Sequence, residues 1–236
     1  FDDMKVKHKN LTVLWNLHKF VIEMEKNLKT NPSELKEHGF DVEERYMFSR
    51  LNSAAKKATQ IFDDCRLNEV PWIAEELFLD LSRTYIQLTR EKSSMGSDEE
   101  KKTVLYTVYN VLYDCLKLFA PIAPFITEAI YQNLKHDFKL KADSVHLLDW
   151  PHCNDGQIDE LLEESMETAS EIVQSALAVR EKIQMGVRWP LKEIVIASRD
   201  ERVKASAEKL MDVIKNQINV KEVKIVDLLP NIKVKI

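Results

Sequence analysis

The sequence predicts a mainly α-helical protein, in which an antiparallel helical bundle is followed by a small α/β subdomain. Long amphipathic segments joined by short connections occupy the first part of the chain, and helices connected in this way pack antiparallel. Only 4 Gly and 7 Pro occur among 236 residues, which suits long helices. Later the pattern changes to strand, helix, strand. We therefore expect the bundle in residues 1–142, and a linker, a long helix and the α/β subdomain in residues 143–236.

Four long helices account for most of the predicted bundle. The second is the clearest, because its apolar residues from Met47 to Cys65 recur at alternating steps of 4 and 3 and so share one face. The third begins at Pro71, a favoured residue in a first helical turn. The fourth opens after the cap candidate Ser97. The expected ranges are about 4–28, about 42–66, residue 71 to the loop at 93–97, and residue 98 to a proline corner.

The proline corner consists of Pro121 and Pro124, which interrupt an otherwise continuous helical pattern. Proline lacks a backbone donor and clashes with the preceding turn, but it is well tolerated in a first helical turn. One helix should therefore end near Phe119, and the next should begin near Pro124.

The C-terminal part contains several shorter predicted elements after an extended segment at 145–150. A long helix is expected at about 158–183, because apolar residues again recur at steps of 4 and 3. Short apolar or alternating runs at 193–197 and 220–226 are typical of strands and flank a helical stretch at about 201–217. The last residues, Ile232–Ile236, alternate apolar and basic and could add one strand.

The composition excludes several classes of protein. No apolar run approaches the roughly 20 residues that a membrane-spanning helix needs, so we expect no membrane partner. The three cysteines are odd in number and widely spaced, which favours reduced thiols in a cytoplasmic protein, with Cys65 and Cys115 buried. The first residue is Phe1 rather than Met, so we expect a piece of a longer protein.

The net charge of −5 argues against a uniformly basic nucleic-acid binder, but the charge is unevenly distributed. Residues 143–171 contain nine acidic residues and no Lys or Arg. From residue 172 onward, thirteen basic residues face eight acidic ones. Any RNA contact must therefore use local basic faces, and the acidic stretch 143–171 could instead dock a partner protein.

The residues carry no recognisable catalytic chemistry. The sequence has no Gly-rich phosphate loop, no nucleophile elbow and no zinc-protease motif, and the pair His152–Cys153 lacks metal-ligand spacing. Catalytic, cofactor-binding and metal sites are therefore expected to be absent from this chain. Trp189–Pro190 is expected to pack the turn between helix and strand rather than to touch RNA.

Six motifs occur in order over about 180 residues. The motifs are Leu14-Trp-Asn-Leu-His-Lys-Phe20, Glu44-Arg-Tyr-Met-Phe-Ser-Arg-Leu-Asn52, Leu81-Ser-Arg-Thr-Tyr-Ile-Gln-Leu-Thr-Arg90, Ala120-Pro-Ile-Ala-Pro-Phe-Ile-Thr-Glu128, Ser144-Val-His-Leu-Leu-Asp-Trp-Pro151 and Val179-Arg-Glu-Lys-Ile-Gln-Met-Gly-Val-Arg-Trp-Pro-Leu-Lys192. Together they resemble the C-terminal anticodon-binding region of isoleucyl-tRNA synthetases, members of the class I aminoacyl-tRNA synthetases. Where the family has Trp, this chain has Tyr46 and Thr84.

The resemblance implies a module that binds the anticodon stem-loop of the tRNA for isoleucine. It implies a parent ligase that uses ATP and Mg²⁺, while the ATP-binding signatures, the editing insertion and the zinc cysteines of that enzyme are absent here, so this piece alone should not aminoacylate. The tRNA-binding residues that the resemblance and the basic segments suggest are Asn16, Lys19, Arg83, Tyr85, Arg90, Arg180, Arg188 and Lys192.

Two alternatives stay open. The chain could be the anticodon-binding domain of a valyl- or leucyl-tRNA synthetase, because these enzymes share most of the motifs. It could also be a helical protein-interaction scaffold that uses the acidic stretch 143–171.

Overall fold

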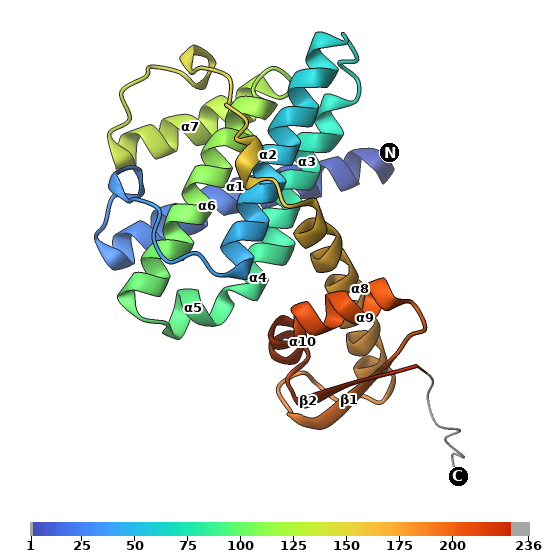
Figure 1. Ribbon diagram of the computed structural model, residues 1–236. Coiled ribbons are helices and arrows are strands. Elements are labelled where there is room, and N and C mark those ends of the chain that lie inside the picture. The colour runs from blue at the N-terminus through green and yellow to red at the C-terminus, as the bar shows by residue number, and fades with distance from the viewer. Residues whose placement is uncertain (1, 228–236) are drawn as a thin grey trace. The chain divides into compact units, whose positions relative to one another are not determined.

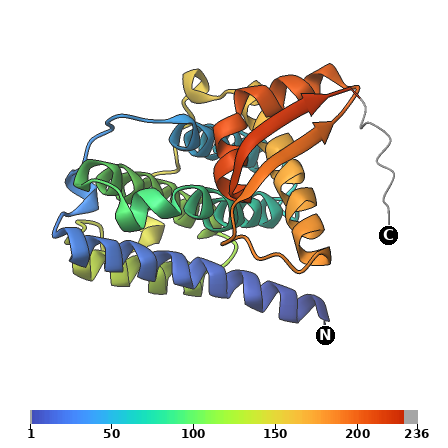
Figure 2. The same ribbon diagram turned by 90° about the horizontal axis from the view of Figure 1, so that it is seen from below.

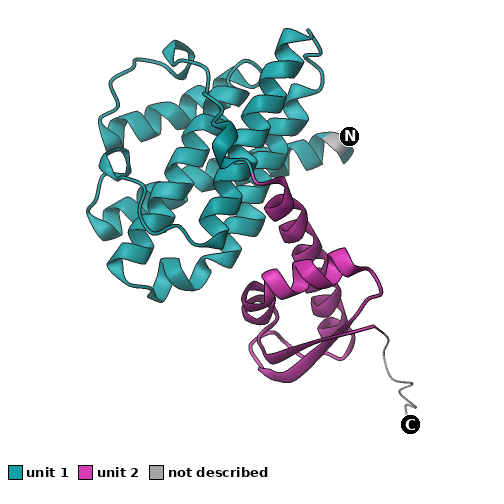
Figure 3. Ribbon diagram, viewed as in Figure 1, with its two compact units in different colours: residues 1–158 teal, residues 159–236 magenta. Residues whose placement is uncertain are grey.

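The computed structural model describes residues 2–227 and divides the chain into two compact units, Phe1–Ile158 and Asp159–Ile236 (Figure 3). The possible strand at Ile232–Ile236 lies outside the described residues. Among the described residues, no helix is both long and apolar enough to cross a membrane. The prediction of a mainly helical chain with a small C-terminal α/β part is confirmed.

Unit 1 is a helical bundle (Figure 1). Short 3₁₀ turns occur at Pro32–Glu34, Val145–Leu147 and Asp155–Gln157. Its helices are α1 (Asp2–Leu28), α2 (Val42–Asp63), α3 (Val70–Asp80), α4 (Ile86–Leu88), α5 (Arg90–Met95), α6 (Asp98–Phe119) and α7 (Pro124–Phe138), with a π-helical turn at Leu81–Tyr85 between α3 and α4.

Helix α6 lies at the centre of this bundle and contacts α1, α2, α3 and α7. Its apolar stripe is fully buried, including Val104, Val108 and Cys115. A capping box starts the helix, because the Ser97 hydroxyl accepts from the backbone of Glu100 and the Glu100 carboxylate accepts from the backbone of Ser97. The predicted corner is confirmed, since α6 ends at Phe119 and α7 begins at Pro124.

The π-helical turn Leu81–Tyr85 explains how the third predicted helix keeps its apolar residues buried. From Ile73 to Tyr85 these residues recur every four positions, and four residues advance an α-helix by about 400°, or about 40° beyond one turn. The wider π turn absorbs this drift. Leu81 and Tyr85 therefore both stay completely buried, whereas Arg83 between them is exposed.

Glu44 joins this turn to the start of α2. The side chain is completely buried, and its Oε1 accepts a hydrogen bond of 3.0 Å from the Tyr85 hydroxyl. Its Oε2 accepts from the backbone N of Asp41 at 3.0 Å and lies 3.4 Å from Lys92 Nζ. Burial and the neighbouring Glu44 carboxylate raise the pKa of Tyr85 well above its usual value, so the hydroxyl stays protonated and donates. One carboxylate thus fixes α2, the π turn and α5 together.

The segment 143–158, expected to belong to the C-terminal part, packs on unit 1, and the units divide between Ile158 and Asp159. Val145 is buried in the bundle core, in a 3₁₀ turn rather than an extended segment. Trp150 Nε1 donates to Thr59 Oγ1 at 2.8 Å, and the backbone N of Asn154 donates to Asn52 Oδ1 at 2.6 Å.

Unit 2 contains α8 (Glu160–Lys182), β1 (Leu191–Ala197), α9 (Glu201–Lys209), α10 (Met211–Ile218) and β2 (Val220–Val226). The two strands pair in parallel, with Ile194 opposite Val223 and Ile196 opposite Ile225. A parallel pair needs a crossover connection, which α9 and α10 supply. The single helix expected at 201–217 is interrupted at Leu210.

The cysteines are unpaired, and one differs from the prediction. Cys115 is buried, as expected, and burial raises the pKa of its thiol to about 12. Cys65 is exposed instead of buried, because α2 ends at Asp63 and Cys65 lies in the following turn with φ = 58°. Continuing the helical stripe two residues too far produced this error.

Replacing Tyr85 by Phe should lower the free energy of unfolding by about 1–3 kcal/mol, because Glu44 Oε1 would stay buried without its donor. Urea denaturation followed by circular dichroism measures this change. Tyr106→Phe is the matched control, since this half-buried hydroxyl has no hydrogen bond within the described residues, and the control should cost less than about 0.5 kcal/mol. Equal losses in both variants would contradict the role given to Glu44.

Unit 1 should also lose stability as the pH falls below about 6.5, the usual pKa of histidine. His18 on α1 is only 2% exposed, and its Nε2 lies 3.2 Å from the Asn133 side-chain nitrogen, which can only donate. Burial lowers the pKa of His18, so the unfolded chain takes up the proton first and the stability present above pH 6.5 is lost on acidification.

The measurement for His18 is the free energy of unfolding at pH 7.5 and pH 5.5. His18→Gln should show a clearly smaller decrease than the wild type, whereas the exposed control His152→Gln should behave like the wild type. A decrease of the same size in all three proteins would disprove the assignment.

Candidate nucleic-acid interface

Helix α1 lies on an edge of unit 1 beside α7 (Figure 2), and it presents an exposed polar stripe from Lys5 to Lys26. The buried face of the helix holds Leu14, Leu17 and Val21 against the core. Seven of its exposed residues recur at steps of 4 and 3, so they share one face. They are Lys5, Lys9, Thr12, Asn16, Lys19, Glu23 and Lys26, and we call them the α1 stripe.

Two of the predicted tRNA-binding residues, Asn16 and Lys19, lie in the centre of the α1 stripe. Within the described part of the chain, Lys9, Lys19 and Lys26 form no salt bridge, so their ammonium groups can contact phosphates. Lys19 Nζ lies 5.9 Å from the centre of the Trp15 ring, a weak cation–π contact that leaves the charge exposed. From Lys5 to Lys26 the stripe is about 32 Å long at 1.5 Å per residue, long enough to follow a nucleic-acid backbone.

A buried carboxylate connects the first half of α1 to α3 and to Arg83. Glu75 is 7% exposed and accepts hydrogen bonds from Lys7 Nζ and Asn10 Nδ2. Asn10 Oδ1 in turn accepts from Arg83 Nη2 at 3.4 Å. Removing a partner from a buried charge is costly, so this network holds the Lys7 and Arg83 side chains in place. The predicted residue Arg83 is thereby brought to the side of α1.

Trp72 was not among the residues suggested by the sequence, yet it is 59% exposed beside this network. Lys7 Nζ lies 3.8 Å above the centre of the Trp72 ring, so a cation and an aromatic face are held together at the surface. Such a pair is typical of surfaces that bind single-stranded nucleic acid. The helical pattern could have identified Trp72, because it directly precedes Ile73 and is therefore about 100° away from the buried stripe of α3.

Tyr85 cannot take the role suggested for it. Its ring is completely buried and its hydroxyl binds Glu44, so it cannot stack on a base. The resemblance identified the position, but the four-residue spacing of apolar residues from Ile73 to Tyr85 already indicated a core residue. Arg90, by contrast, is exposed at the start of α5.

In unit 2 the predicted residues separate into one buried and two exposed side chains. Arg180 is only 2% exposed, and its Nη2 donates to the backbone carbonyls of Gly186, at 2.8 Å, and Trp189. It therefore cannot contact a phosphate directly, contrary to the prediction. Arg188 and Lys192 are exposed. Trp189 is 72% exposed, so the expectation that it packs the helix-to-strand turn is wrong.

The acidic stretch 143–171 is divided between the two units. Two of its carboxylates in unit 1 are paired, since Asp143 lies 2.7 Å from Lys135 Nζ and Asp155 lies 2.7 Å from Lys56 Nζ. In unit 2, Glu164, Glu167 and Glu171 are exposed on α8. The stretch is therefore not one continuous acidic surface within either unit.

Comparison with known proteins identifies the family that the chain resembles in sequence. A family model described as the anticodon-binding domain of tRNA ligase matches residues 44–196. The chain is 37% identical over 220 residues to an isoleucine–tRNA ligase of Thermococcus kodakarensis, covering 90% of this chain and 20% of that relative. It is 31% identical over 239 residues to an isoleucine–tRNA ligase of Methanothermobacter thermautotrophicus, covering 99% of this chain and 23% of the relative. The chain thus spans about a fifth of the length of these relatives.

Proposed function

The chain belongs to the anticodon-binding domain family of tRNA ligases, and from this premise we propose that it binds the anticodon stem-loop of the tRNA for isoleucine. The observation that carries the proposal is the α1 stripe, in which unpaired lysines and Asn16 lie in line on one exposed helix face. Such a face supplies positive charge locally, although the chain as a whole has a net charge of −5.

The division of roles follows from the chemistry of the side chains. Lys9, Lys19 and Lys26 contact phosphates and so set the register of the RNA, because a lysine charge carries no base specificity. The Asn16 amide can both donate and accept, so it can bind a base edge or a ribose hydroxyl. Trp72, with Lys7 on its ring, offers a surface on which an unpaired base stacks.

The parent protein is, on this proposal, an isoleucine–tRNA ligase, which joins isoleucine to its tRNA with ATP and Mg²⁺. The relatives carry that name, and this chain corresponds to about a fifth of their length. The residues described here contribute RNA binding, whereas the ATP and amino-acid chemistry is assigned to the remainder of the parent protein. This chain accordingly needs no cofactor for its own role.

The chain should bind a stem-loop with the isoleucine anticodon more tightly than a stem-loop of the same length with an unrelated loop, and affinity should fall as salt increases. Fluorescence anisotropy at about 50 and 150 mM salt measures both properties. Stem-loops with valine and leucine anticodons test whether the chain comes instead from a valyl- or leucyl-tRNA synthetase. Equal affinity for every stem-loop would refute the isoleucine assignment, and capture of a protein partner without RNA binding would favour an interaction scaffold.

Lys9→Ala and Lys19→Ala should each weaken binding to all stem-loops alike, because a phosphate contact is independent of sequence. Each should reduce the slope of log affinity against log salt by about 1, since one fewer counterion is released. Lys57→Ala is the control, because Lys57 is an exposed lysine on α2. A slope that changes as much in the control as in the α1 variants would remove α1 from the interface.

A further inference from the structure

The loop between α8 and β1, residues 183–190, carries three large apolar side chains that are exposed. Ile183 is 58% exposed, Val187 is 41% exposed and Trp189 is 72% exposed. Large exposed apolar groups in a contiguous segment mark interaction sites. We call this segment the 183–190 loop.

The backbone of this loop is fixed by hydrogen bonds. Besides the two bonds from Arg180 Nη2, the backbone N of Trp189 donates to the carbonyl of Gly186 at 3.1 Å. Asn219 Nδ2, at the end of α10, donates to the carbonyl of Val187 at 2.8 Å. The carbonyls of Gly186, Val187 and Trp189 therefore all have donors, and the exposed side chains project from a rigid backbone.

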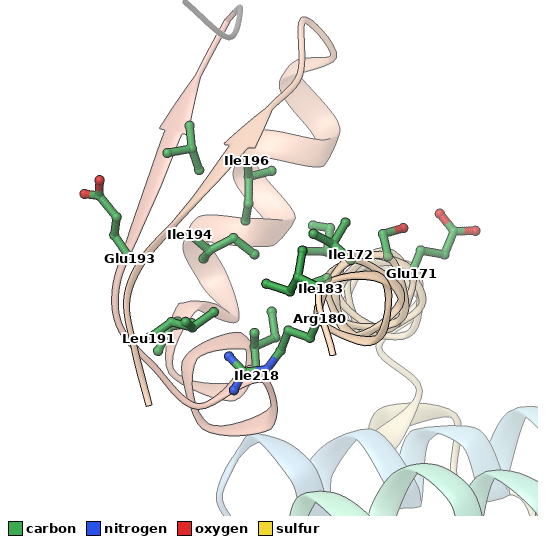
Figure 4. Close-up of a pocket in the computed structure, with 14 residues that line it drawn as sticks. Glu171, Ile172, Arg180, Ile183, Leu191, Glu193, Ile194, Ile196 and Ile218 are labelled. Atoms are coloured by element: carbon green, nitrogen blue, oxygen red, sulfur yellow. The ribbon is translucent and has the colours of Figure 1, made fainter. Parts of the chain in front are cut away.

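The buried guanidinium of Arg180 has no acidic partner among the described residues, and its Nε and Nη1 have no hydrogen-bond partner there. Figure 4 shows Arg180 extending from α8 toward Ile218, beside a pocket of about 520 Å³ lined mainly by aliphatic side chains. Burying a charge without a carboxylate is unfavourable. Through its hydrogen bonds to the loop carbonyls, this arginine fixes the shape of the 183–190 loop. Its role is therefore that of a positioning residue.

The charges around Trp189 favour a nucleic acid over an apolar peptide as the occupant. Arg188 and Lys192 flank the ring in the chain and are both exposed. The nearest acidic residue on the strand, Glu193, is already paired with Lys224. Within residues 2–227, neither of these two cations forms a salt bridge. A rigid exposed aromatic ring between such cations is the arrangement that binds single strands, by stacking on bases and neutralising phosphates.

We propose that the 183–190 loop is a second RNA-binding element. In it, Trp189 stacks on an unpaired base, Arg188 and Lys192 bind the adjacent phosphates, and Arg180 holds the loop in the receptive shape. The inference rests on the proposed function and extends it, because it assigns to unit 2 a contact with single-stranded RNA.

The test uses the 236-residue chain and a fluorescent stem-loop with the isoleucine anticodon, extended by a single-stranded tail. Trp189→Ala should weaken binding about tenfold or more, the range that loss of one base–aromatic stack produces, and should leave the salt slope unchanged. Trp189→Phe should keep most of the affinity. Phe125→Ala removes an exposed ring in unit 1 that is 90% exposed, and this control should bind like the wild type.

Arg180→Met tests the positioning role through a double-mutant cycle. Alone it should weaken binding, but combined with Trp189→Ala it should add little further loss, because it acts through that ring. Unchanged binding by Trp189→Ala, with the wild type bound, would overturn this inference and leave the proposed function intact. Fully additive losses in the cycle would overturn the role of Arg180. Absence of binding by the wild type would overturn both proposals.

Discussion

The buried carboxylate of Glu44 is the constraint on which unit 1 depends. Helix α2, the π turn and α5 all meet at this group, and each supplies it with a donor from a different element. A buried carboxylate tolerates little displacement of its donors, because a lost bond leaves charge unsatisfied in a medium of low dielectric constant. The π turn is thereby fixed with Tyr85 inward and Arg83 outward. The outward position of the Arg83 cation thus follows from the buried Glu44 carboxylate.

The same principle recurs at both proposed RNA-binding surfaces. Glu75 is buried beneath Lys7 and Asn10, and Asn10 links it to Arg83. It keeps the Lys7 cation above the Trp72 ring. In unit 2 the buried charge is positive instead of negative, because the buried cation Arg180 holds backbone carbonyls beneath an exposed tryptophan. In each case a buried charge fixes an aromatic group and a cation at the surface before any ligand arrives. Preorganisation of this kind reduces the entropy lost on binding.

Periodicity and caps allowed most of the fold to be predicted from the sequence. The corner at Pro121 and Pro124 follows from local backbone chemistry, and the buried stripe of α6 follows from spacing alone. The site was harder, because a motif locates a residue in a family but not its orientation. Tyr85 and Arg180 belong to the motifs and are buried, whereas Trp72 and Trp189 are exposed. The direction in which these side chains point depends on the π turn and on backbone carbonyls several residues away. A local sequence pattern contains neither feature.

The proposed function places the anticodon stem-loop on the exposed stripe of α1. Photo-cross-linking tests it most directly, with 4-thiouridine placed in the stem-loop and cross-linked peptides of the 236-residue chain identified by mass spectrometry. Cross-links are expected within α1, around Asn16 and Lys19. Cross-links confined to segments outside α1, such as the acidic residues of α8, would contradict it.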